Sequence, residues 1–140
     1  MTPVLYAILA AFSFGIWTVF HKLASPHINQ IFGAIVVSFS AVIAGSIILL
    51  TQMHQVRLVT NSKGVYFLIL AGITAFAIDF FALQAYSKGL SITVGGPIII
   101  GGSIAVAACV GFLLGDTITT QKVAGLALLI AGAAILSASV

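Results

Sequence analysis

Five long apolar stretches divide the chain, and short polar segments separate them. The apolar stretches cover about residues 3–23, 31–50, 64–86, 92–114 and 121–139. Each has about 20 residues, the length that an α-helix needs to cross the hydrocarbon core of a bilayer. Their apolar residues do not alternate with polar ones, as they would in a membrane-spanning strand. The pattern predicts an all-α fold, an integral membrane bundle of five transmembrane helices.

Local signals mark the ends of several of these predicted helices. Thr2-Pro3 places a capping hydroxyl before a proline at the first helical position. Ser25-Pro26 interrupts the chain after the first stretch. Gly89 follows the third stretch, where a helix end favours a residue in the left-handed conformation. No positive charge precedes the first stretch, so we expect a retained helix rather than a cleaved signal peptide.

The composition excludes most other classes of protein. Of the 140 residues, 61% are hydrophobic and only 5% are charged, whereas a soluble domain has roughly 25% charged residues. A soluble enzyme or soluble binding module is therefore excluded. The histidines, the cysteine and the aspartates have no metal-ligand spacing, and no phosphate-binding glycine loop stands beside a lysine. We expect no catalytic site, no metal and no cofactor, and the small net charge of +3 gives no reason to expect nucleic acid binding.

The charges in the predicted connections hardly distinguish the two sides of the membrane. Arg57, Lys63 and Lys122 fall on the side of the N-terminus, and Lys22 and Lys88 fall on the other side. An excess of basic residues normally marks the cytoplasmic side. The weak bias has two interpretations. It is either a poor signal from a small protein, or the chain inserts in both orientations and pairs head-to-tail with itself.

Asp79 lies within the third predicted helix. A carboxyl group in the hydrocarbon region costs roughly 2.5–3.5 kcal/mol on insertion scales and normally faces a cavity or a partner. At helical spacing its neighbours are Gly72, Ala75, Ala82 and Tyr86, a small and partly polar face that we expect to point inward. The carboxyl group could exchange a proton for a substrate, or it could only bond a hydroxyl or backbone group on a neighbouring helix.

The fourth predicted helix contains Gly96 and Pro97. The proline removes one helical hydrogen bond and kinks the helix. Kinked or broken helices often border a midplane site in transporters, although glycines also let helices approach closely. We expect Gly96 and Pro97 to line a cavity or to act as a hinge.

Ser13, Trp17 and His21 share one face of the first predicted helix at a spacing of four residues. Trp17 could form the aromatic wall of a cavity, or it could belong to the aromatic belt at the membrane interface. For His21, which stands near the helix end, a position among the lipid headgroups is favoured.

Several short motifs, taken in their order and spacing, resemble one EamA-type repeat of the drug/metabolite transporter superfamily. They are Phe81-Ala82-Leu83-Gln84-Ala85-Tyr86, Gly96-Pro97, Leu113-Leu114-Gly115-Asp116 and Gln121-Lys122-Val123-Ala124-Gly125. The family's usual residue at the position of Asp116 is glutamate. The resemblance covers nearly the whole chain and implies a single EamA-like transmembrane domain over residues 1–140. The family typically has ten helices in two inverted five-helix repeats, so one repeat alone implies a dimer.

The resemblance and the residues together lead to one hypothesis. We expect an antiparallel homodimer in the cell (inner or plasma) membrane that moves a small-molecule metabolite, in the direction of export, by alternating access. Coupling to protons would act through Asp79, and Trp17, Tyr86, Gly96 and Pro97 would border the same central cavity. The alternative is a non-transporting membrane subunit, or half of a heterodimeric transporter whose partner is a homologous five-helix subunit.

Overall fold

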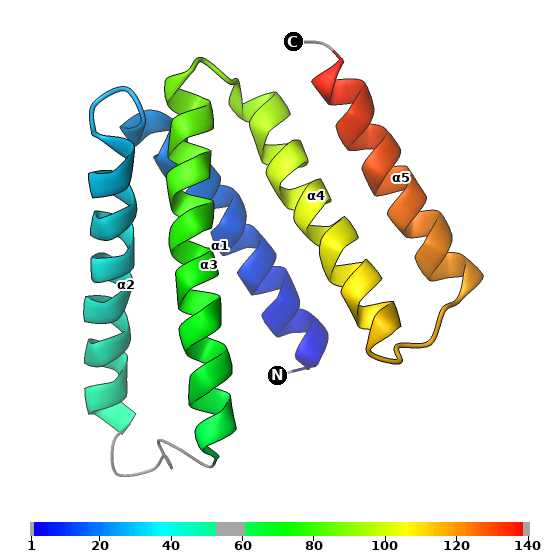
Figure 1. Cartoon of the computed structure of the whole chain (residues 1–140), viewed down its shortest axis with the longest axis horizontal. Coiled ribbons are helices and arrows are strands. Elements are labelled where there is room, and N and C mark those ends of the chain that lie inside the picture. Colours follow the sequence, from blue (N-terminus) through cyan, green and yellow to red (C-terminus); the bar gives the residue numbers. More distant parts are fainter. Residues whose placement is uncertain (1, 53–60, 139–140) are drawn as a thin grey trace.

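The computed structural model describes residues 2–52 and 61–138 of the chain, and these residues form five α-helices (Figure 1). The helices are α1 (Pro3–Ala24), α2 (Gln30–Gln52), α3 (Ser62–Ser87), α4 (Ile92–Leu113) and α5 (Thr120–Ser137). All five are long and apolar enough to cross a membrane. The prediction of an all-helical bundle with five transmembrane helices is confirmed. Arg57 and residue 139 of the fifth predicted helix lie outside the described residues.

Three helices form the centre of the bundle. α1, α3 and α4 contact one another, α2 packs against α3, and α5 packs against α4. Successive helices run in opposite directions, so the first and last helices leave the two chain ends at opposite ends of the bundle (Figure 1). The connections α1–α2 and α3–α4 lie at the same end of the bundle (Figure 1). We call this end the closed end, because the helices pack most closely there.

Turn and cap residues fix where the helices begin and end. Gly89 after α3 and Gly115 after α4 have φ angles of 99° and 102°, a backbone region that side chains other than glycine rarely adopt. The left-handed conformation predicted for Gly89 is therefore observed. The side chains of Asn61 and Thr119 accept backbone hydrogen bonds from the first turns of α3 and α5, which satisfies donors that a helix N-terminus leaves free.

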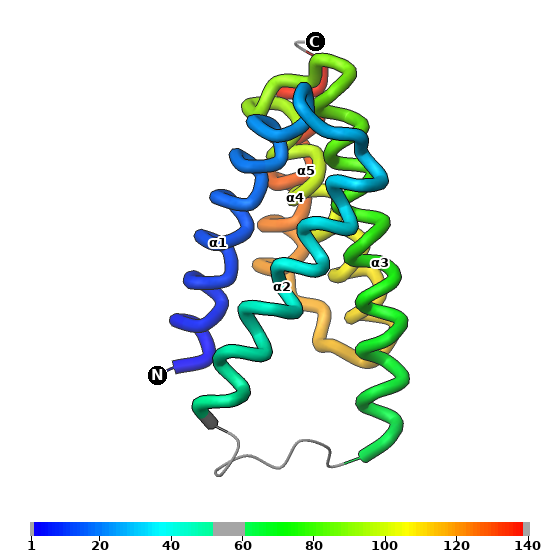
Figure 2. The backbone as a smooth tube through the Cα atoms, turned by 90° about the vertical axis from the view of Figure 1, so that its left-hand side faces the viewer, coloured from blue at the N-terminus to red at the C-terminus, as the bar shows by residue number. Residues whose placement is uncertain are grey.

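The buried side chains gather at the closed end. They come from the second half of α1, the first turns of α2, the second half of α3 and the start of α4: Thr18, His21, Ser25, Ala34, Asp79, Ala82, Leu83, Tyr86 and Val94. Because neighbouring helices run in opposite directions, these segments meet at one end of the bundle. Figure 2 shows the helices close together there and spread apart toward the opposite end. The described part of α5 buries no residue at all.

A lysine and a glycine contribute to this packing. Nζ of Lys22, in the last turn of α1, donates hydrogen bonds to the carbonyl oxygens of Tyr86 and Leu90 at 3.3 and 2.7 Å. A cation is favourable at the C-terminal end of a helix, where carbonyl groups lack partners. On α4, Gly95 leaves room for the ring of Tyr86, since a Cβ atom at this position would lie 2.6 Å from Cε1 of the tyrosine.

The close contact at Gly95 predicts a strong effect of a single methyl group. Gly95→Ala is expected to lower the free energy of unfolding by about 1–3 kcal/mol, because the buried Tyr86 ring must shift. Gly102→Ala on the same helix is the matched control, since a Cβ there meets no atom within 4 Å. Denaturant titration in detergent micelles measures both. Equal stability of the two variants would contradict the packing described for Tyr86.

Candidate functional site

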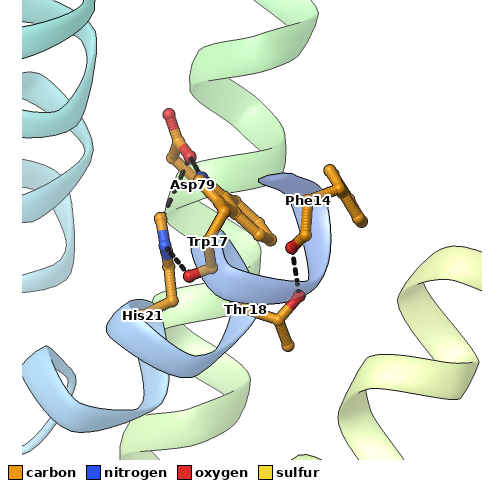
Figure 3. A network of polar contacts seen from close by, with 5 residues as sticks. All are labelled: Phe14, Trp17, Thr18, His21 and Asp79. Carbon is orange, nitrogen blue, oxygen red and sulfur yellow. Dashed lines mark hydrogen bonds and ion pairs between the residues drawn. The ribbon is translucent and has the colours of Figure 1, made fainter. Parts of the chain in front are cut away.

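The one acid within the membrane-spanning helices contacts two side chains of α1. Nε1 of Trp17 donates a hydrogen bond of 3.0 Å to Oδ1 of Asp79, on α3. Nε2 of His21 lies 3.1 Å from the same oxygen (Figure 3). Asp79 is 6% exposed and His21 is 3% exposed. The carboxyl group is therefore held between two ring nitrogens of one helix, one turn apart.

The hydrogen bond of Nδ1, the second ring nitrogen of His21, determines which nitrogen carries a hydrogen in the neutral ring. Nδ1 lies 3.0 Å from the backbone oxygen of Trp17, and because a carbonyl oxygen only accepts, Nδ1 carries a hydrogen. Nε2 makes no hydrogen bond of good geometry within the described chain. The polar atom that faces it is Oδ1 of Asp79. An attractive contact between Nε2 and the carboxyl group then requires one proton, on the imidazole or on the acid. Without that proton a nitrogen lone pair would face a carboxylate.

Aromatic rings keep Trp17 in this orientation. The Phe14 ring stacks on the Trp17 ring, with a centroid separation of 4.9 Å and an angle of 16°. The His21 ring lies against the same indole at 3.8 Å. Thr18 bonds the backbone oxygen of Phe14 at 3.0 Å and points away from Asp79 (Figure 3). The three rings follow one face of α1, so the position of each depends on the others.

A cavity of about 610 Å³ lies beside this contact, between α1 and α2. We call it the α1–α2 cavity. Ser13, Trp17 and His21 of α1, Ser40 of α2 and Leu83 of α3 line it, with apolar side chains between them. Its volume falls in the range of small-molecule sites, roughly 300–1,000 Å³. Asp79 is not itself part of the lining, but Trp17 and His21, which contact its carboxyl group, are.

Gly96 and Pro97 line a different cavity. It has about 450 Å³ and lies between α1, α4 and α5, where Gly15 and Thr18 form its α1 wall. Gly96 and Pro97 therefore do not share a cavity with Trp17, and Asp79 lines neither cavity, whereas all four were expected around one central cavity. The two cavities lie on different faces of α1.

Tyr86 lies in the packed closed end, not in the lining of either cavity. Its side chain is 2% exposed, and its hydroxyl group has no hydrogen-bond partner among the residues that the structure describes. The predicted inward face of α3 is correct for Ala82 and Tyr86 but wrong for Gly72 and Ala75, which are exposed. They stand in the half of α3 that is farther from the closed end, where the helices spread apart.

The expected position of His21 among the lipid headgroups is wrong. Its side chain is buried and faces Asp79. A usable signal was present, because His21 follows Trp17 by one helical turn and is the one histidine inside the described helices. A histidine and an acid are the two residue types most suited to sharing a proton near neutral pH.

The family model of the EamA-like transporter family matches residues 1–138. The chain belongs to the EamA-like transporter family. No curated protein and no solved structure gives a significant match. The EamA-like transporter family is part of the drug/metabolite transporter superfamily, and the five helices of this chain correspond to a single five-helix repeat. The chain is a multi-pass membrane protein of a transporter family.

The hydrogen bond between Trp17 and Asp79 predicts a measurable coupling energy. Asp79→Ala is expected to lower the free energy of unfolding by about 1–3 kcal/mol, because a half-buried indole N–H loses its acceptor. In the Trp17→Phe background the same substitution is expected to cost less, with a coupling of about 0.5–3 kcal/mol. Denaturant titration of the two single variants and the double variant measures this cycle.

Asp116→Ala is the control for the loss of an acid, because Asp116 is exposed and lies outside the helices. Its expected effect is within about 0.5 kcal/mol. Strictly additive effects of Asp79→Ala and Trp17→Phe would show that the two side chains do not interact.

Proposed function

We propose that two copies of this chain pair in antiparallel orientation in the cell membrane and export a small metabolite by alternating access. Transport is coupled to protons at the contact between Asp79 and His21. The observation that carries this proposal is a titratable pair, buried at the contact of two helices and adjacent to a cavity of substrate size. Intramembrane acids and histidines of this kind commonly serve as proton relays in transporters.

The accessible surface supports pairing with a second subunit. The chain exposes 10324 Å², whereas a compact monomer of this length exposes roughly 6,800 Å² by the usual scaling with mass. Obligate interfaces bury roughly 2,000–5,000 Å² in total, about half of it on each partner, so the excess on one copy is more than large enough for such an interface. Lipid can cover the apolar part of this surface. Ser13 and Ser40, which line the α1–α2 cavity, are polar side chains on the exposed surface.

The antiparallel arrangement follows from two further observations. The lysine and arginine residues give almost no orientation bias, three on one side of the membrane and two on the other. Each copy also packs tightly at one end and is spread at the other (Figure 2). An inverted pair places one closed end on each side of the membrane, which gives both sides an equivalent gate.

The contact at Asp79 supplies a physical link between protonation and helix position. With one shared proton, the contact holds α1 against α3. Without it, the same atoms repel and the contact favours separation of the two helices. The titratable groups near this contact are His21 and Lys22 on α1 and Asp79 and Tyr86 on α3. α2 carries no ionisable side chain, and the described part of α4 carries only the exposed Cys109.

The orientation of the chain tests the antiparallel homodimer. A fluorescent reporter that is active in the cytoplasm and a phosphatase that is active in the periplasm are fused, separately, after Val140 in a bacterial host. We expect both fusions to be active, because the basic residues do not fix one orientation. Adding two lysines to the α3–α4 connection is the control and should leave only one fusion active. Activity of a single reporter in the unaltered chain would rule out self-pairing by inversion and would favour a homologous five-helix partner.

Proton coupling is tested in liposomes that hold the purified protein and the pH-sensitive dye pyranine. The probes are glucose, L-leucine, tyramine, 4-hydroxyphenylacetate and a protein-free filtrate of the host cells. At least one of them is expected to drive proton movement faster than in liposomes without protein. Asp79→Asn should reduce this movement to the protein-free rate, because the amide cannot take up the shared proton.

Asp116→Asn removes the other acid of the chain and should leave the movement unchanged. If no probe moves protons faster with the unaltered protein than with Asp79→Asn, coupling through Asp79 is wrong.

A further inference from the structure

The serine side chains of the α1–α2 cavity offer acceptors rather than donors. Oγ of Ser13 donates its hydrogen to the backbone oxygen of Leu9 at 2.8 Å, and Oγ of Ser40 donates to that of Val36 at the same distance. Each hydroxyl group has one hydrogen and two lone pairs. Because the hydrogens are used within the helices, the lone pairs remain for a ligand.

The two rings that line the cavity have also used their hydrogens. The Trp17 indole N–H is directed to Asp79, and Nδ1–H of His21 is directed to the backbone of Trp17. The second oxygen of Asp79 accepts no hydrogen bond from the described part of the chain, and Figure 3 shows it pointing away from both rings. All four polar side chains of the lining therefore lack a free hydrogen, and an acid with one unused oxygen contacts two of them.

No lysine of the described chain lines the cavity. His21, in the lining, faces Asp79 with Nε2, and Nζ of Lys22 donates hydrogen bonds to two backbone oxygens at the closed end. Lys63, Lys88 and Lys122 stand at helix ends, and Arg57 falls between α2 and α3 in the sequence.

From this inventory we propose that the cavity selects an amine with an apolar body and rejects carboxylates and phosphates. This inference rests on the proposed function for the location of the site. The ammonium group donates hydrogen bonds to the Ser13 and Ser40 oxygens, and the acid at Asp79, which contacts the Trp17 and His21 rings of the lining, favours its positive charge from a distance. The apolar body contacts Ile16 and Val36 in the lining. An anion entering the same space finds no donor to replace its water, and burial of an unpaired charge is strongly unfavourable.

Trp17 allows a direct test, because it is the single tryptophan of the chain and lines the cavity. Its fluorescence is titrated in detergent at neutral pH with three probes of similar size: phenethylamine, 2-phenylethanol and 3-phenylpropanoate. Phenethylamine is expected to change the emission saturably, with a dissociation constant on the order of tenfold lower than that of 2-phenylethanol. The dissociation constant of 3-phenylpropanoate is expected to be higher than that of 2-phenylethanol. Tighter binding of 3-phenylpropanoate than of phenethylamine would overturn the proposal.

Two variants assign the preference to the acid. Asp79→Asn is expected to abolish the advantage of phenethylamine over 2-phenylethanol, while Asp116→Asn retains it. Persistence of the advantage in Asp79→Asn would also overturn the proposal. If Asp79→Asn does not fold, as judged by size-exclusion chromatography, the order of the three probes on the unaltered protein still decides.

The outcomes separate this inference from the proposed function. Selective amine binding in detergent without probe-driven proton movement in liposomes would support the cavity chemistry and reject proton-coupled transport. Proton movement driven by a carboxylate or by L-leucine, together with no preference for phenethylamine, would reject the amine specificity and leave transport in place.

Discussion

The acid at Asp79 is the constraint on which the rest of the bundle depends. A charged group in the middle of an apolar helix costs roughly 2.5–3.5 kcal/mol on insertion scales, so it needs partners from another helix. Trp17 and His21 provide them from α1, with nitrogens 3.0 and 3.1 Å from one carboxyl oxygen. This requirement fixes where α1 lies along α3. It also brings Lys22, the next residue of α1, within reach of the carbonyl oxygens at the end of α3.

The position of this contact explains why packing is concentrated at one end. Asp79 lies in the second half of α3 and His21 in the last turns of α1, so the side chains that surround them belong to the closed end. The opposite end holds no comparable polar contact between helices in the described chain. Its side chains are mostly apolar and exposed, and they do not require one arrangement of the helices. Such an end can change its shape at a lower free-energy cost than the closed end.

Hydrophobic run length was enough to predict the five helices, because the bilayer imposes one length on every span. The position of Gly89 after a helix was enough to predict its left-handed conformation, because its φ of 99° depends on the adjacent turn alone. The cost of a buried acid drew attention to Asp79 but did not reveal its partners. Trp17 and Asp79 are 62 positions apart, and which residues of α1 and α3 meet depends on how the helices cross. For the same reason the sequence did not predict that His21 is buried, or that Gly96 and Pro97 line a separate cavity.

α1 is the one helix that lines both described cavities. Trp17 and His21 face the α1–α2 cavity, while Gly15 and Thr18 face the cavity that Gly96 and Pro97 line. A displacement of α1 toward α4 would therefore enlarge the first cavity and reduce the second. Two sets of polar contacts oppose such a displacement: Asp79 with the two rings, and Lys22 with the end of α3. Only the first set joins a histidine to an acid, a pairing suited to sharing a proton. In the proposed transporter, α1 is accordingly the helix whose position responds to protonation, and the substrate cavity lies directly against it.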